Sequence, residues 1–126
     1  MARRIRIEVG GQIVHGTLSD NDTADQIWSI LPIETSVQTW GDEFYFGIGL
    51  SLDEAPDARV EMKVGELTYW PPGNAFCIFF GPTPASHSDE PRAASTVNPF
   101  GMIEDDVAAF KGIPSGTRIL VEAVEP

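Results

Sequence analysis

The stretch LTYWPPGNAFCIFF, residues 67–80, decides the fold, because two apolar runs flank a short chain break. Residues 67–70 favour extended structure, and the Pro-Pro-Gly-Asn segment that follows at 71–74 ends a strand. Residues 75–80 form a continuous apolar run whose length is typical of a buried strand. The stretch therefore predicts two strands, the second of them central in a sheet.

Similar strand patterns lie on both sides of this stretch. Residues 4–9 alternate between apolar and polar side chains, Gly10-Gly11 can form a turn, and residues 12–18 resume an extended run. This arrangement predicts a β-hairpin. Further strands are expected near residues 33–39, 44–50, 59–63, 100–103 and 118–124.

Two short segments interrupt the β pattern. Residues 19–22 offer N-caps, apolar residues follow at helical spacing, and Pro32 ends a helix expected at about 22–31. A second short helix is expected after Asp105. Residues 81–99 hold four prolines and are expected to form a long irregular loop. Because a β chain of this size protects its edges best by closure, we expect one mainly β domain over residues 1–126, folded as a barrel.

The composition restricts the partners. The formal net charge is −11, which argues against nucleic acid and anionic membranes, since both need a basic surface on the protein. No Lys or Arg occurs between Arg6 and Arg59. The single cysteine, Cys77, forms no internal disulfide or cysteine-based zinc site, and its apolar neighbours predict an inert buried thiol. No apolar segment follows the N-terminal arginines, so we expect no signal peptide and a cytoplasmic location.

Four segments carry a family resemblance: WGDEFYF at 40–46, GELTYWPPG at 65–73, FCIFFGPTP at 76–84 and NPFGMI at 98–103. With these segments in this order, the chain resembles the cyclophilin-like family of small prokaryotic proteins of uncharacterised function over nearly its whole length. The resemblance implies a closed eight-stranded β-barrel with two short capping helices, as in the peptidyl-prolyl isomerases.

The chain lacks the residues that catalyse the reaction in the peptidyl-prolyl isomerases. True cyclophilins carry a Phe-His-Arg segment whose arginine polarises the prolyl carbonyl, and this chain has no such tripeptide. No Lys or Arg occurs at positions 7–58, where that arginine would fall. We therefore assign no catalytic residue and favour a non-enzymatic role, because function depends on the site and not on the fold.

Other catalytic arrangements find little support. His15 lies in a predicted strand, and His87 lies beside serines and acids in a loop, where a hydrolase triad rarely forms from neighbouring residues. Asp42 and Glu43 are adjacent, so their side chains are expected on opposite faces of a strand and not in one sugar-hydrolysing cleft. No cofactor or metal site is predicted.

The aromatic residues give the more informative hypothesis. Most of them are expected to fill the barrel. Some of them, with polar groups nearby, are candidates for an apolar cleft of the kind that binds small ligands, with the loop at 81–99 as a wall or lid. The candidate ligand-binding residues are Trp40, Glu43, Tyr45, Trp70, Phe79, Thr83, Asn98 and Phe100.

Three functions remain open on the sequence alone. The first is a barrel that binds a small molecule or peptide in an aromatic cleft without prolyl-isomerase catalysis. The alternative is a weak peptidyl-prolyl cis-trans isomerase. The third is a subunit or interaction domain, with a homodimer as one form.

Overall fold

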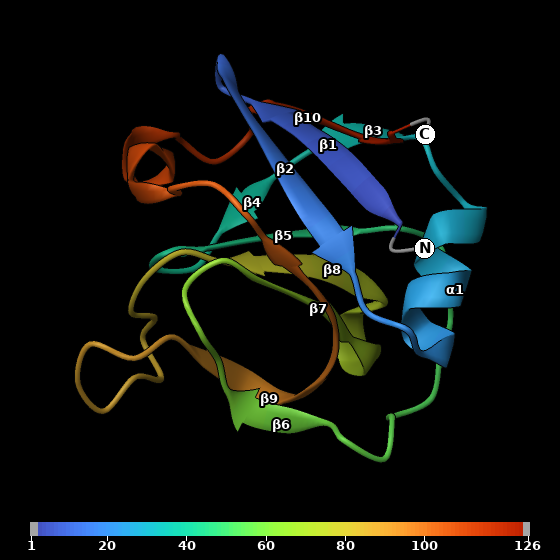
Figure 1. The fold of residues 1–126 in the computed structure, drawn as a ribbon. Helices are drawn as coiled ribbons and strands as arrows, with labels where there is room; N and C mark the ends of the chain where they lie inside the picture. The colour runs from blue at the N-terminus through green and yellow to red at the C-terminus, as the bar shows by residue number, and fades with distance from the viewer. Residues whose placement is uncertain (1–2, 125–126) are drawn as a thin grey trace.

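The computed structural model describes residues 3–124, and this part of the chain is mainly β-structure (Figure 1). Its ten strands are β1 (Arg4–Val9), β2 (Gln12–Leu18), β3 (Ile33–Ser36), β4 (Gln38–Thr39), β5 (Glu43–Gly47), β6 (Arg59–Glu61), β7 (Glu66–Trp70), β8 (Ala75–Phe79), β9 (Arg92–Ile103) and β10 (Arg118–Ala123). Its helices are α1 (Asp22–Ser29) and the short 3-10 helices η1 (Pro71–Gly73) and η2 (Ala108–Gly112).

The strands form one antiparallel sheet in the order β3-β10-β1-β2-β9-β7-β8-β5-β4, and β6 pairs with β9 beside this path. The two end strands, β3 and β4, are consecutive in the chain and are joined by Val37. Within the described residues no hydrogen-bonded ladder joins β3 to β4. The mainly β fold is confirmed, whereas the closed barrel of eight strands is not.

The two predictions made most directly from sequence patterns are confirmed. Gly10 and Gly11 have φ angles of 57° and 79°, and they connect β1 to β2 in the expected hairpin. Strand β8 lies between β7 and β5, and all five of its residues are buried. Burial on both faces explains why this strand is apolar without alternation.

The β5-β8-β7 part of the sheet separates two hydrophobic cores. The larger core lies inside the rolled sheet, where Phe76 stacks on Phe46 with ring centroids 4.9 Å apart. The smaller core lies on the other face of these strands, between them and the first half of β9. Figure 1 shows β6 and this half of β9 side by side below β7. Its buried members are Met62, Ala75, Cys77, Phe79, Ala93 and Val97.

The prediction of an irregular loop over residues 81–99 is wrong for its second part, because β9 begins at Arg92. The segment expected as a short strand at 100–103 is the end of this twelve-residue strand. Its first half pairs with β6, and its second half pairs with β7 and β2. The register between β9 and β7 shifts beside Pro99, where an irregularity lets a strand bend. Small and polar residues in the first half hide its strand pattern.

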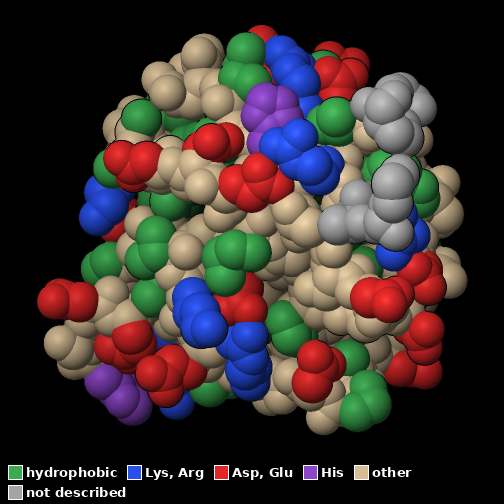
Figure 2. Space-filling view, in the orientation of Figure 1, with side chains coloured by type: hydrophobic (Ala, Val, Ile, Leu, Met, Phe, Trp, Pro, Cys, Tyr) green, Lys and Arg blue, Asp and Glu red, His purple; other side chains and the backbone are tan. Residues whose placement is uncertain are grey.

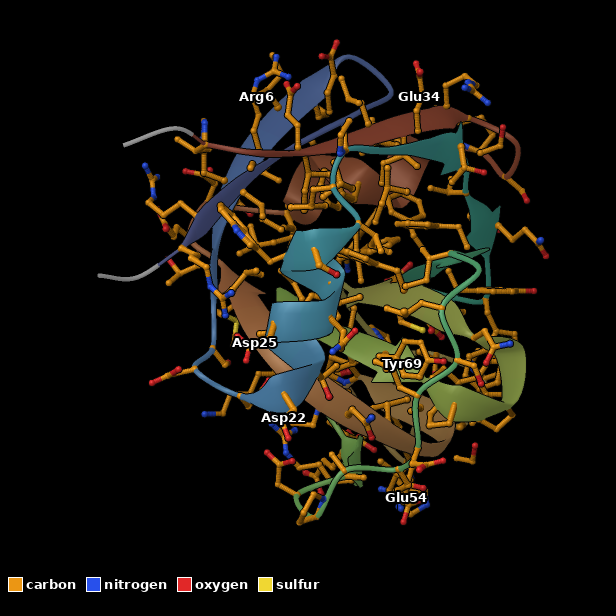
Figure 3. All side chains as sticks on the ribbon, turned by 90° about the vertical axis from the view of Figure 1, so that its right-hand side faces the viewer. Arg6, Asp22, Asp25, Glu34, Glu54 and Tyr69 are labelled. Carbon is orange, nitrogen blue, oxygen red and sulfur yellow. The ribbon has the colours of Figure 1, made fainter. Side chains whose placement is uncertain are left out.

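The first predicted helix is confirmed, and the second takes a different form. Helix α1 begins after Asn21, whose side chain accepts a hydrogen bond from the Ala24 N–H at 2.9 Å. Figure 3 shows α1 lying across the strands at one side of the molecule. The second helical segment, after Asp105, is the 3-10 helix η2 and not an α-helix. Among the described residues, no helix has the length and apolar character needed to cross a membrane.

Most cationic side chains are already held by acidic ones, and Figure 2 shows blue and red groups side by side on one face. Arg4 lies 2.8 Å from Glu104, and Arg6 lies 2.8 Å from Glu122. Six of the eight Lys and Arg residues belong to such pairs: Arg3, Arg4, Arg6, Arg59, Lys111 and Arg118. Few cationic side chains therefore remain to neutralise the other carboxylates of this negatively charged chain.

Candidate functional site

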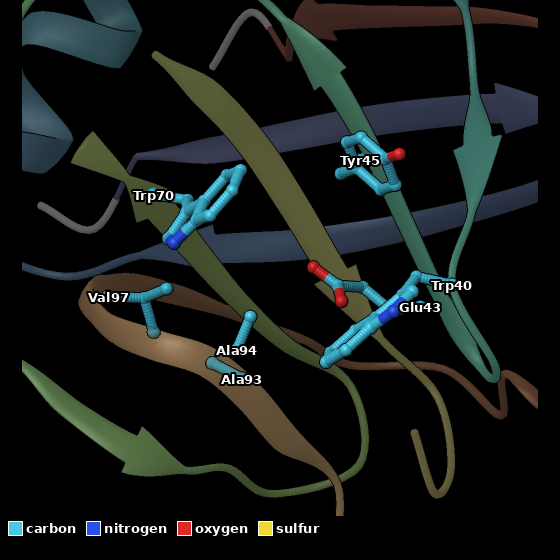
Figure 4. A pocket seen from close by; sticks show the side chains of 7 residues that line it. All are labelled: Trp40, Glu43, Tyr45, Trp70, Ala93, Ala94 and Val97. Atoms are coloured by element: carbon cyan, nitrogen blue, oxygen red, sulfur yellow. The ribbon is translucent and has the colours of Figure 1, made fainter. Parts of the chain in front are cut away.

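A cleft of about 150 Å³ opens on the outer face of the β5-β8-β7 sheet, beside the smaller core (Figure 4). Its lining is mainly apolar and aromatic, with one carboxylate. The lining residues are Trp40, Glu43, Tyr45, Trp70, Ala93, Ala94 and Val97. A cavity of about this size and character holds a molecule as large as benzene.

The alternation of the strands brings these side chains to one face. Phe44 and Phe46 of β5 point into the larger core, so Glu43 and Tyr45 point to the outer face. Trp70, at the end of β7, lies on the same side, since it also packs against the smaller core. The first half of β9 forms the opposite wall, and Trp40 closes one end (Figure 4).

The turn before β5 fixes Trp40 and Glu43. The Trp40 N–H donates to the Glu43 carbonyl at 3.0 Å, and Gly41 between them has a φ of 60°. The Asp42 N–H donates to the Pro82 carbonyl at 2.9 Å, which ties the turn to the segment after β8. Two of the segments that carry the family resemblance therefore hold each other in place.

Trp70 is oriented by contacts on two sides. Its indole Nε1–H donates to the Ser95 hydroxyl at 2.7 Å, which connects it to β9. A Cβ placed on Gly73 would lie 2.7 Å from the indole ring, so only a glycine lets η1 approach so closely. The Pro-Pro-Gly segment thus both ends β7 and packs against one wall of the cleft.

Glu43 is the only ionisable carboxylate of the cleft lining, and its side chain has an unusual environment. It is 6% exposed. Burial, which disfavours the charged form, raises its pKa to about 7, and the neighbouring Cys77 thiol offsets this only in part. Burial also raises the pKa of Cys77, as expected for an inert thiol. The cleft therefore contains a carboxyl group that changes charge near neutral pH.

Four of the eight candidate residues from the sequence meet in the cleft: Trp40, Glu43, Tyr45 and Trp70. The other four do not line it. Phe79 is fully buried in the smaller core, and Phe100 lies in the larger core against Phe76, with ring centroids 5.0 Å apart. Thr83 and Asn98 are buried and hydrogen-bonded to backbone groups of neighbouring segments.

Sequence reasoning missed the wall formed by Ala93, Ala94 and Val97. These residues lie in the segment that was expected to be a loop. Ala93 and Val97 are buried, whereas Ala94 is exposed. The spacing of apolar Ala93 and Val97 around polar Ser95 was the available signal, and the prolines at 91 and 99 obscured it.

The other candidate groups lie apart from the cleft. Asp42 points away from Glu43, and its carboxylate lies 3.4 Å from the Lys111 ammonium, as the alternation of strand faces predicted. His87 is exposed and His15 is half-buried in β2. Across residues 3–124, no three His, Cys, Asp or Glu side chains gather closely enough to hold a metal ion.

The rolled antiparallel sheet and the aromatic cleft on its outer face define a small β protein with a ligand-sized cavity. The chain belongs to the cyclophilin-like family, whose sequence model matches residues 3–122. It is similar to a hypothetical protein of Archaeoglobus fulgidus whose solution structure is known, with 32% sequence identity and a TM-score of 0.82. That match covers 98% of this chain and 95% of the archaeal one. No curated protein matches the chain.

Proposed function

We propose that this protein binds a small molecule, or one side chain of a peptide, in the cleft between β5, β7 and β9, without catalysing prolyl isomerisation. One observation carries the proposal: an aromatic cavity of about 150 Å³ that contains a single buried carboxylate. Binding sites commonly combine an apolar lining with a few polar groups that orient the ligand. The small volume favours a compact group over an extended peptide.

The held positions of the lining residues support a binding role. Trp70 is fixed by Ser95 and Gly73, and the turn at Trp40 is fixed by the segment after β8. A wall that is ordered before the ligand arrives loses little conformational entropy on binding. The half-buried rings of Trp40, Tyr45 and Trp70 thus form a preformed site.

Weak peptidyl-prolyl isomerase activity is the second candidate, and the family membership favours it. An apolar cavity of this size also accepts a five-membered proline ring. The seven lining residues include no Lys, Arg or His that would polarise the prolyl carbonyl. A proline-isomerisation assay on a short peptide distinguishes the two functions, and we expect rates equal to those in buffer.

A ligand screen by thermal shift tests the binding proposal, because a ligand that binds the folded state alone raises the Tm. The Ala94→Phe variant places a ring over the cleft from an exposed position and should abolish any shift. Ala109→Phe, on the exposed side of η2, is the matched control and should keep it. Ligands that shift both variants equally, or a broad library without a single shift, would contradict the proposal.

An interaction role, including a homodimer, stays a prediction. The two large apolar side chains that are exposed among the described residues are Ile13, in β2, and Val64, between β6 and β7. Light scattering after size exclusion measures the mass, and a dimer that persists in Ala94→Phe would place its interface away from the cleft.

A further inference from the structure

Two buried glutamates on the same sheet face have opposite surroundings, and this contrast deepens the proposed function, on which the inference rests. Glu43 of β5 is 6% exposed and Glu66 of β7 is 5% exposed. Tyr45 and Thr68 both lie opposite Cys77 of β8, so the alternation of strands puts Glu43 and Glu66 on the outer face together. Burying a carboxylate is costly unless a cation or donors accompany it.

Glu66 has such partners within the fold. The Arg59 guanidinium contacts both of its carboxylate oxygens, one of them at 3.1 Å. The Lys63 backbone N–H also donates to the carboxylate, at 2.9 Å. The chain therefore satisfies a buried carboxylate on this face with an arginine of its own.

Glu43 has no such partner among the described residues, where it forms no ion pair. The groups facing it are the Tyr45 side chain on its own strand and the Cys77 thiol of β8. From β9 it faces Ala93, Ala94 and Val97, none of which is charged, and from the turn it faces Trp40. Figure 4 shows its carboxylate directed into the cleft between the aromatic rings.

The cleft walls suit a cation that the chain does not supply. Within the described residues, every stacked aromatic pair consists of phenylalanines, so Trp40, Tyr45 and Trp70 stack on none of the aromatic rings. Their ring faces carry negative potential and attract weakly hydrated cations, with tryptophan the strongest. The net charge of −11 adds a long-range attraction for a positive ligand.

We propose that the cleft binds an alkylated ammonium group, with Glu43 as its counter-ion and Trp40, Tyr45 and Trp70 as its aromatic walls. A trimethylammonium group is about as large as benzene and so fits a cavity of about 150 Å³. A divalent metal ion fits poorly, because it needs several oxygen ligands and the cleft offers one carboxylate. The ammonium group can belong to a free small molecule or to a methylated lysine of a peptide.

Calorimetric titration with choline tests the charge requirement directly, because 3,3-dimethylbutan-1-ol has the same shape without the charge. We expect choline to bind at least about tenfold more tightly than this neutral alcohol. The Glu43→Gln variant should lose most of that preference, since only the aromatic walls then favour the charge, while it keeps the wild-type circular dichroism spectrum. Glu61→Gln removes the same charge from an exposed site on β6 and should keep the preference.

The pH dependence supplies a second readout. Because burial raises the pKa of Glu43 to about 7, its charged fraction increases about tenfold between pH 6 and 8. Choline affinity should therefore increase about tenfold over this interval in the wild type and stay constant in Glu43→Gln. Affinity that is independent of pH in the wild type would remove Glu43 as the counter-ion.

The outcomes separate this inference from the binding proposal. Equal affinity for choline and the neutral alcohol, or no binding of choline while neutral library compounds bind in the cleft, overturns the ammonium inference and leaves a binding protein. A failure of every library compound overturns both. A peptide with trimethyllysine and its norleucine counterpart form the second arm, and a preference for the modified peptide that exceeds the preference for choline identifies a peptide as the source of the cation.

Discussion

Gly41 lies so close to Thr83 that a Cβ at position 41 would stand 2.8 Å from the Thr83 Cα. The Pro82 carbonyl would lie 3.0 Å from the same Cβ. These are backbone atoms, so they cannot move aside as the end of a flexible side chain would. The contact joins the turn that carries Trp40 and Glu43 to the Gly-Pro-Thr-Pro segment, and it sets the position of one end of the cleft.

Gly41→Ala should therefore destabilise the protein by about 2 kcal/mol or more, since it adds a steric clash to a left-handed backbone. Gly11→Ala is the control, because Gly11 has a φ of 79° but nothing within 4 Å of an added Cβ. Urea unfolding measures both variants. Equal losses would mean that the close approach to Thr83 contributes nothing beyond the cost of the backbone conformation.

The parts of the fold that local patterns determine were predictable. Gly10-Gly11 between two extended segments predicts a hairpin, and an unbroken apolar run at 75–80 predicts a buried central strand. The cleft residues Trp40, Glu43, Tyr45 and Trp70 were found because they are aromatic or polar residues of the segments that carry the family resemblance. Neither step needs knowledge of distant contacts.

The rest depends on contacts between segments far apart in the chain. Asn98 and Phe100 are two positions apart in one segment, as Glu43 and Tyr45 are in the cleft. The bend in β9 nevertheless turns Phe100 into the larger core and Asn98 toward the loop before β6. Similarly, the strand expected near residues 59–63 is present as β6, but its partner, the first half of β9, was expected to be a loop. Local propensity contains no information about either pairing.

Asn98 should matter for stability and not for ligand affinity. Its side chain accepts from the Ala55 N–H at 2.8 Å and donates to the Asp53 carbonyl at 2.9 Å. Asn98→Ala removes both bonds and should cost about 1–3 kcal/mol of unfolding free energy. Asn98→Asp keeps the acceptor and loses the donor. Its loss of unfolding free energy should therefore differ from that of Asn98→Ala when both variants are measured by urea unfolding. A large loss of ligand affinity in a folded Asn98→Ala protein would show that this residue reaches the cleft.

Thr68 offers a stabilising substitution. Its hydroxyl is fully buried and has no regular hydrogen-bond partner among the described residues. It faces the Cys77 thiol, which bonds weakly. Thr68→Val replaces the hydroxyl with a methyl group of similar size and should raise the free energy of unfolding by about 1 kcal/mol. Thr68→Ser, which keeps the hydroxyl and removes the methyl, should lower it. A destabilised valine variant would indicate that the hydroxyl has a partner, such as an ordered water.

Glu43 should make stability decrease with pH in a range where most acids have already titrated. Its ordinary pKa is 4.5 and burial raises the pKa in the folded protein to about 7. Between these values the folded chain holds a proton that the unfolded chain releases, so the contribution is full below pH 4.5 and is lost as the pH rises through 7. The total loss is about 3 kcal/mol.

Glu43→Gln stays neutral, so its stability relative to the wild type should increase by about that amount between pH 4 and 8. Glu61→Gln, at an exposed position of β6, should show no such change. Parallel curves of unfolding free energy against pH for the wild type and Glu43→Gln would mean that the Glu43 carboxylate is already solvated in the folded state.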